Sequence, residues 1–169
     1  MGLAKVLPEE AGLIEGIVDT GIIVISRFNN PAKKAALNFL KDVLMWRRKC
    51  LIPVTTFLGA YHIMTRYLGV DDASAYRAIT RTLKIRSPSL HEDISVESVI
   101  DSLTYALSYD IESWDGYIVC LAKRFRAPIT YSVDKELARK VREIQVINPI
   151  PPEIFAQYNR WLSEKLKGT

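Results

Sequence analysis

The segment from Asp110 to Asp134, DIESWDGYIVCLAKRFRAPITYSVD, decides the fold that this sequence predicts. Asp110 is the expected N-cap of a helix, and Glu112 and Asp115 follow in its first turn, where acids suit the helix dipole. Apolar residues recur at helical spacing along this helix and are predicted to face a core, namely Trp114, Ile118, Leu121, Ala122 and Phe125.

The second half of this segment predicts a turn and then a buried strand. Ala127-Pro128 ends the helix, because proline cannot continue it, and residues 129–131 (ITY) are of the types that strands prefer. Asp134 follows at the carboxyl end of that strand, just before a second helix that begins at Lys135. An acid early in one helix and an acid after the next strand reach the same edge of a parallel sheet, where open α/β folds place their sites.

Strand and helix patterns alternate along the rest of the chain. Strands are predicted at residues 13–20, 51–54, 129–131 and 144–147, with an extended segment at 87–94. Further helices are predicted at residues 32–48, 55–68, 73–83, 95–109 and 153–167. Residues 21–25 are open to two interpretations, since they could extend the first strand or begin a helix. This alternation predicts an α/β fold, a three-layer α/β/α sandwich with a mainly parallel central sheet.

Polar residues and glycine mark the ends of two of these helices. Thr55 or Thr56 is expected to cap the helix at 55–68, and Gly69 is expected to end it, as glycine often does past a helix C-terminus. Asp71 or Asp72 is expected to cap the next helix.

Length and composition predict a single domain over residues 1–169, with residues 1–10 as a polar tail. The formal net charge of +4 permits a polyanionic partner but does not require one. Cys50 and Cys120 belong to no metal-binding or redox motif, so we expect two reduced, buried cysteines in a cytoplasmic protein. Glu15 and Asp19 interrupt the longest apolar stretch, so no membrane span is expected.

Three carboxylates occupy equivalent positions in the predicted topology: Asp19 after the first strand, Asp115 in the first turn of a helix, and Asp134 after a later strand. Acids gathered at one sheet edge repel one another unless a cation lies between them. Oxygen ligands of this kind suit Mg²⁺ or Mn²⁺. Taken singly, each aspartate could equally cap a helix or close a turn.

The sequences around these acids, IVDTG, SWDGYIVCLAKRF and PITYSVDKELA, resemble the PIN-domain family, which includes VapC-type ribonuclease toxins. The resemblance implies a metal-dependent nuclease in which Asp19, Asp115 and Asp134 hold Mg²⁺ or Mn²⁺ and position a water to attack an RNA phosphodiester. It also implies that Thr20 and Ser132 support the ligands or the waters of the metal.

One position departs from the family pattern, which has a glutamate near the start of the helix after the second strand. That helix reads TTFLGAYHIMTRYL, and the expected place holds Gly59, or Ala60 in a shifted register. Neither residue can bind a metal. Glu112, one helical turn before Asp115, could supply the missing carboxylate, or it could be an ordinary acid at a helix start.

Two functions remain open at this point. The first is an active metal-dependent endoribonuclease, and the second is a catalytically weakened PIN-fold protein that binds RNA or a protein. Arg77, Arg81 and Lys84 could follow a phosphate backbone or form a solvated helix face. The resemblance further implies an antitoxin-type partner and a homodimer, for which the apolar helix at residues 55–68 is the expected contact.

Overall fold

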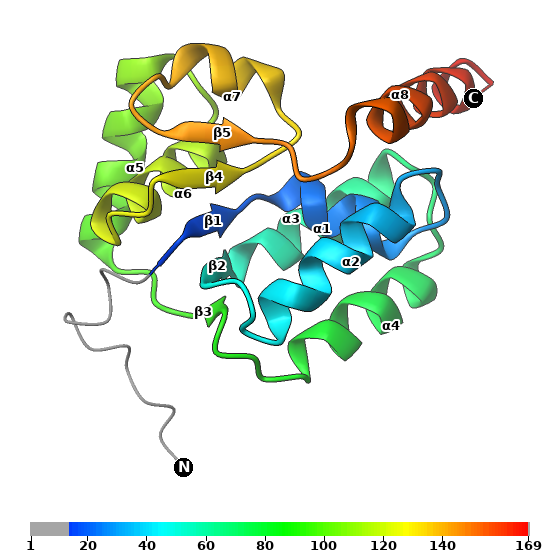
Figure 1. Ribbon diagram of the computed structural model, residues 1–169, viewed down its shortest axis with the longest axis horizontal. Helices are drawn as coiled ribbons and strands as arrows, with labels where there is room; N and C mark the ends of the chain where they lie inside the picture. The colour runs from blue at the N-terminus through cyan, green and yellow to red at the C-terminus, as the bar shows by residue number, and fades with distance from the viewer. Residues whose placement is uncertain (1–13, 169) are drawn as a thin grey trace.

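The computed structural model describes residues 14–168, which include five parallel strands in one sheet (Figure 1). The strand order is β3-β2-β1-β4-β5, and every printed pairing between neighbours is parallel. The strands are β1 (Gly16–Val18), β2 (Cys50–Pro53), β3 (Leu90–His91), β4 (Ile129–Tyr131) and β5 (Gln145–Ile147). The predicted α/β fold with a parallel central sheet is therefore confirmed. The predicted tail at residues 1–10 lies outside the described residues.

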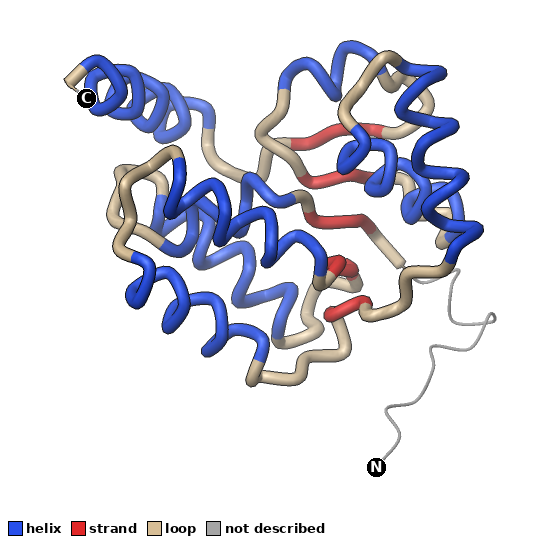
Figure 2. The backbone as a smooth tube through the Cα atoms, turned by 180° about the vertical axis from the view of Figure 1, so that it is seen from behind, coloured by secondary structure: helices blue, strands red, loops and turns tan. Residues whose placement is uncertain are grey.

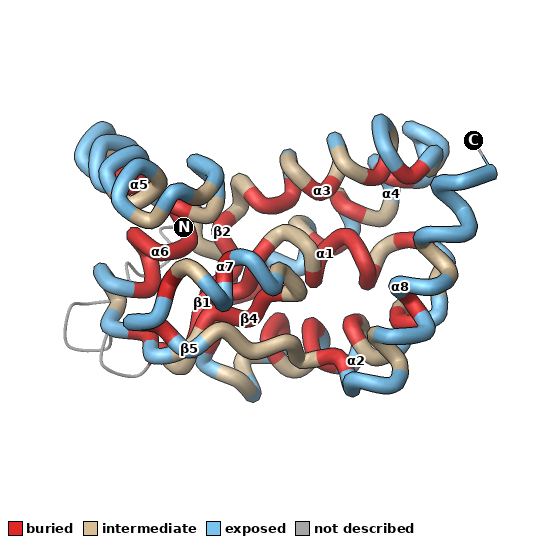
Figure 3. The backbone as a smooth tube through the Cα atoms, turned by 90° about the horizontal axis from the view of Figure 1, so that it is seen from above, coloured by how far each residue is buried: buried red, intermediate tan, exposed pale blue. Residues whose placement is uncertain are grey.

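Eight helices of the described chain surround this sheet and give the three layers (Figure 2). They are α1 (Thr20–Arg27), α2 (Lys33–Leu44), α3 (Thr55–Arg66), α4 (Asp72–Leu83), α5 (Val96–Tyr109), α6 (Ser113–Arg124), α7 (Lys135–Lys140) and α8 (Pro152–Lys167). Successive strand residues point to opposite faces. Val18 accordingly belongs to a core cluster with side chains of α1–α4 and α8, whereas Ile17 belongs to a second cluster with side chains of α6 and α7. Figure 3 shows buried backbone along the strands and the inner helices and exposed backbone on α5 and α8.

The first strand is shorter than the sequence predicts, because Asp19 ends it. The Asp19 carboxylate accepts a hydrogen bond from the Thr20 backbone N–H at 2.6 Å and so caps α1. Residues 21–25 therefore begin a helix and do not extend the strand. Gly21 suits this position, since a Cβ there would lie 2.8 Å from Val133 Cγ2. The turn from β1 into α1 leaves Asp19 at the carboxyl edge of the sheet.

The predictions for Asp110 and Trp114 are wrong. Asp110 does not cap α6; it is the C-cap of α5, with a left-handed φ of 53°. The helix α6 begins at Ser113, and Glu112 is its N-cap residue, with no side-chain capping bond. Trp114 is 58% exposed and does not face a core, because the buried face of α6 starts at Gly116. Gly116 lies so close to α5 that a Cβ would meet the Ser102 carbonyl oxygen at 2.2 Å.

The remaining core residues predicted for this helix fit better. Ile118, Leu121 and Ala122 are buried, and Phe125 is half-buried against the same cluster. Both free cysteines, Cys50 and Cys120, are buried, as predicted.

The predicted helix ends are only partly correct. The helix at 32–48 ends already at Leu44, because the chain turns through a left-handed Trp46 with φ 58°. Neither threonine caps α3, since Val54 is the N-cap residue and makes no side-chain bond. Asp71, rather than Asp72, caps α4 by accepting from the Ser74 N–H, and Gly69 adopts the expected positive φ of 64°. Within residues 14–168, no helix combines the length and the apolar character of a membrane span.

Candidate functional site

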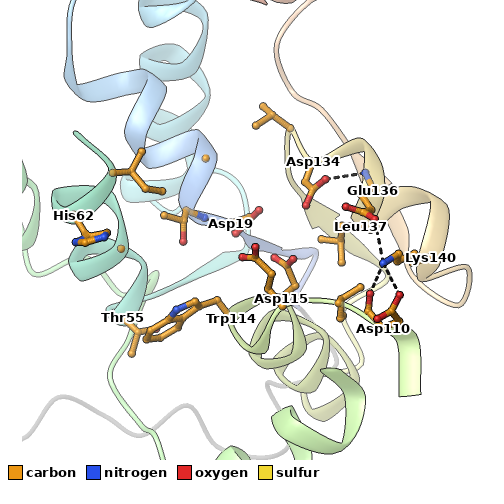
Figure 4. Close-up of a pocket in the computed structure, with 17 residues that line it drawn as sticks. Asp19, Thr55, His62, Asp110, Trp114, Asp115, Asp134, Glu136, Leu137 and Lys140 are labelled. Carbon is orange, nitrogen blue, oxygen red and sulfur yellow. Dashed lines mark hydrogen bonds and ion pairs between the residues drawn. The ribbon is translucent and has the colours of Figure 1, made fainter. Parts of the chain in front are cut away.

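A cavity of about 660 Å³ opens at the carboxyl edge of the sheet, between α3, α6 and α7 (Figure 4). Asp19, Asp115 and Asp134 all line it, although they are far apart in the sequence. Thr20 and Glu112 line it as well. The structure thus brings into one cavity the three aspartates that the sequence singles out.

Asp19 is the most deeply placed of these acids. Its Oδ1 accepts from the Thr20 N–H and its Oδ2 accepts from the Ser132 hydroxyl, each at 2.6 Å. Ser132 also accepts from the Asp134 N–H at 3.1 Å, so one hydroxyl joins the ends of β1 and β4. Burial raises the pKa of Asp19, and these two hydrogen bonds only partly counter that effect. Ser132 does not line the cavity; it supports Asp19 from behind.

Asp115 carries the clearest electrostatic signature in the cavity. Burial, followed by repulsion from Asp19, Asp134 and Glu112, raises the pKa of Asp115 from 3.8 to about 7. The carboxylates therefore interact across the cavity, and negative charge accumulates where they face one another. A carboxyl group perturbed by burial and by specific like charges in a cleft is characteristic of functional sites.

Asp134 and Asp19 also have ordinary structural roles. Asp134 caps α7 by accepting from the Glu136 N–H at 2.7 Å, as Asp19 caps α1. Asp134 uses only Oδ1 in that bond, which leaves its second oxygen available. The Glu112 side chain makes no capping bond and is exposed at the cavity, so it too is available for a ligand. Capping and ligand binding are compatible roles here.

The donor set suits a hard divalent cation in its chemistry, since it consists of carboxylate oxygens whose mutual repulsion a cation would relieve. As placed, however, no three His, Cys, Asp or Glu side chains within residues 14–168 are grouped closely enough to hold a metal ion. Figure 4 shows Asp19, Asp115 and Asp134 turned toward a common space from three different elements. The three carboxylates therefore face one space without forming a closed ligand group within residues 14–168.

Gly59 occupies the wall of the cavity where the PIN-family pattern has a glutamate. A Cβ at this position would lie 3.3 Å from Thr20 Cγ2, so a side chain there requires a shift of a few tenths of an ångström. Within residues 14–168, the cavity wall therefore gains no carboxylate from α3.

Lys140, Trp114 and His62 are among the cavity-lining side chains that are absent from the sequence-based site. Lys140 donates from Nζ to Asp110 Oδ2 at 3.1 Å and pairs with Glu136 at 3.0 Å, which ties α7 to the α5–α6 junction. Trp114 and His62 also line the cavity. The only sequence signal for Lys140 is its place four residues after Glu136. The helical spacing of Trp114 predicts a core position rather than a cavity position, and His62 is isolated in the sequence.

Comparison with known proteins gives fold-level similarity alone. No family model and no curated protein matches this chain. The solved structure of PAE2754 from Pyrobaculum aerophilum is similar with a TM-score of 0.56 and 18% identity, over 92% of this chain and 91% of that chain. FitAcB from Neisseria gonorrhoeae is similar with a TM-score of 0.53 and 16% identity, over 79% of this chain and 96% of that chain.

The fold is PIN-like. This agrees with the fold that the sequence motifs imply, and it places the aspartate cavity at the carboxyl edge of a PIN-like sheet. The roles of the individual site residues, the metal and the substrate stay predictions.

Proposed function

We propose that this PIN-like protein is a Mg²⁺- or Mn²⁺-dependent endoribonuclease. The observation that carries the proposal is the convergence of Asp19, Asp115 and Asp134 on one cavity, with the pKa of Asp115 raised to about 7. Charge repulsion of this size destabilises a carboxylate cluster unless the cluster binds a cation. The motif resemblance to PIN nucleases supplies the substrate class, RNA.

In this mechanism Asp19, Asp115 and Asp134 would hold the divalent ion, and the bound ion would lower the pKa of a water and offset charge on the scissile phosphate. Ser132 and the Thr20 N–H fix both oxygens of Asp19, so that carboxylate keeps one orientation. With its pKa raised to about 7, Asp115 is partly protonated near neutral pH when no cation is present. Cation binding should therefore release a proton from Asp115, and this release can be measured by calorimetry in buffers of different ionisation enthalpy.

Cleavage of a fluorescent RNA tests the proposal. Activity should require Mn²⁺ or Mg²⁺, disappear with EDTA, and disappear in Asp115→Asn while that variant keeps its fold. Asp72→Asn is the matched control, since Asp72 is also a first-turn aspartate, but on α4 and away from the cavity. Cleavage that persists in EDTA, or in Asp115→Asn, would overturn the assignment.

The second candidate function is a catalytically weakened PIN-fold protein that binds RNA or a protein. Gly59 favours it, because α3 brings no carboxylate to the cavity wall. RNA binding in EDTA combined with undetectable cleavage at saturating Mn²⁺ would select this function over the first. The antitoxin-type partner and the cytoplasmic location stay predictions that the same measurements do not address.

A second copy of the chain is the partner that we propose for the outer face of α5. The sequence-based choice was residues 55–68, but Leu58 is the one large hydrophobic residue on α3 that is strongly exposed. On α5, by contrast, apolar side chains are exposed at Val96, Ile100, Leu103 and Leu107, the last at 85%. Their 4-3-4 spacing is that of a helix–helix seam.

The contact between two α5 helices is testable by light scattering coupled to gel filtration. The wild-type chain should run as a dimer, and Leu103→Glu combined with Leu107→Glu should give a folded monomer, because both side chains are exposed and carry no core packing. Leu58→Glu is the matched control on α3 and should leave the dimer intact. A monomeric wild-type chain would refute this contact.

A further inference from the structure

Trp114 is an exposed indole at the mouth of the carboxylate cavity. Trp114 is 58% exposed and lines the same cavity as Asp115, its neighbour in the chain. The other two tryptophans are half-buried, and Trp161 stacks on Tyr158. Trp114 has no ring–ring or cation–ring contact within residues 14–168. An indole left in water forgoes the favourable burial of a large apolar surface.

The backbone that carries Trp114 is fixed by packing. Trp114 lies in the first turn of α6, two residues before Gly116, where a Cβ would lie 2.2 Å from the Ser102 carbonyl oxygen of α5 and so leaves no room for a side chain. On the other side of the junction, Lys140 holds the Asp110 carboxylate at 3.1 Å. The indole is thus presented from a rigid element rather than from a loop, as a binding surface requires.

The opposite wall of the cavity is one face of α3. Thr55, Gly59 and His62 line the cavity from this helix, and Arg66 continues their 4-3-4 spacing beyond it. Arg66 is exposed and makes no ion pair with any residue from 14 to 168. Figure 4 shows Trp114 beside Thr55 at the mouth, with His62 further along the same wall. The absence of a side chain at Gly59 keeps the space between these walls open.

The chemical groups along this opening are an acidic cluster, a flat apolar ring and an imidazole, and Arg66 follows the imidazole one helical turn further along α3. A nucleotide strand offers the matching groups, a phosphate at the cation site, a base with a π-face, and a further phosphate. Base stacking on an exposed aromatic ring contributes about 1–3 kcal/mol per base, and it requires a base that is not already paired.

We propose that Trp114 stacks an unpaired base next to the phosphate that lies at the carboxylate cavity, so the protein selects single-stranded over double-stranded nucleic acid. Arg66 and His62 meet the backbone phosphate beyond that base. This inference rests on the proposed nuclease function for the position of the scissile phosphate. An apolar peptide segment is the competing occupant, and it would bind without regard to phosphate or to strand pairing.

The test is fluorescence anisotropy with a labelled single-stranded oligouridylate of about ten nucleotides, within the usual range of site sizes. Binding is measured in EDTA and low salt, so cleavage does not interfere. Trp114→Ala should weaken binding about 5- to 150-fold, the range that corresponds to the loss of one stacked base. Trp114→Phe should recover most of the affinity, because it restores a ring. Tyr76→Ala is the matched control, an exposed aromatic on α4 outside the cavity, and should change nothing.

A second arm compares the single strand with a blunt duplex containing the same uridylate strand. The wild-type protein should prefer the single strand, and Trp114→Ala should lose most of that preference. Equal binding of both forms by the wild type, or unchanged binding by Trp114→Ala, would overturn the inference. Circular dichroism of each variant excludes unfolding as the cause of any loss.

Failure of this inference and failure of the proposed function give different results. Metal-dependent cleavage with an unchanged KM in Trp114→Ala would remove the stacking role and keep the nuclease. Trp114-dependent binding of single strands without any metal-dependent cleavage would remove the nuclease and keep the stacking surface.

Discussion

Replacement of Asp115 by asparagine should stabilise the metal-free protein at neutral and alkaline pH. Burial and the neighbouring acids raise the pKa of Asp115 from 3.8 to about 7, so the folded state disfavours its charge. Between these two values the unfolded chain has released its proton while the folded chain retains it. The free energy of unfolding therefore falls as pH rises through this interval and is constant above it. Asparagine removes the penalty, because it carries no charge to repel.

The size of the gain follows from the same pKa. At 1.36 kcal/mol per pH unit, a rise from 3.8 to about 7 sets a ceiling of about 4 kcal/mol. Asp115 is only half-buried, so solvent screening reduces this to roughly 1–2 kcal/mol. Loss of a first-turn acid from α6 opposes the gain by about 0.3–1 kcal/mol. The net effect is roughly 1 kcal/mol, or about 2–4 °C in Tm for a chain of this length.

Thermal unfolding followed by circular dichroism in EDTA measures this effect. The advantage of Asp115→Asn should be largest near pH 8 and should shrink as the pH is lowered toward 5. Asp72→Asn, on the exposed first turn of α4, should show no such gain. Added Mn²⁺ should raise the Tm of the wild type more than that of Asp115→Asn. An advantage that does not depend on pH, or a loss of stability at pH 8, would refute the electrostatic account.

Two further predictions concern the residues around the acids. Gly59→Glu should tighten Mn²⁺ binding in calorimetry, since it adds a carboxylate to the cavity wall. A Cβ at position 59 would lie 3.3 Å from Thr20 Cγ2. Gly59→Ala is the control, because it introduces the same Cβ and a similar gain in helix propensity without the carboxylate. Equal Mn²⁺ affinity in the Glu and Ala variants would contradict it. Ser132→Ala should weaken Mn²⁺ binding and lower the free energy of unfolding by about 1–3 kcal/mol, because the Asp19 carboxylate loses the buried hydrogen bond that the Ser132 hydroxyl donates. An unchanged denaturation midpoint would count against the support of Asp19 by Ser132.

The sequence predicts the fold well where local pattern and topology agree. The strand at residues 129–131 appears as predicted, because β-branched and aromatic residues follow a proline and precede an acid that caps the next helix. The positions of Asp19 and Asp134 were also predictable, since both end a buried strand and cap the helix that follows. Their placement in one cavity follows from parallel strand order alone.

Other features depended on tertiary contacts that local pattern does not carry. Asp110 ends α5 in a left-handed conformation and accepts a hydrogen bond from Lys140, which lies thirty residues away in the sequence. The exposed apolar residues of α5 are a second feature that the local pattern does not predict. One side of α5 packs against α6, and the apolar residues on its outer side are exposed within the described chain. Helical spacing alone does not distinguish an inner from an outer apolar stripe.

The errors at Asp110 and Trp114 have one physical cause with a functional consequence. Because Asp110 ends α5, it cannot begin α6, and α6 starts three residues later at Ser113. The first turn of α6, which carries Trp114 and Asp115, therefore lines the cavity and precedes the buried part of the helix, which starts at Gly116. Trp114 and Asp115 consequently reach the cavity together, and the indole is exposed beside the carboxyl group. The junction between α5 and α6 thus determines that an acid and an aromatic ring share one rim, which is the arrangement from which both proposed roles follow.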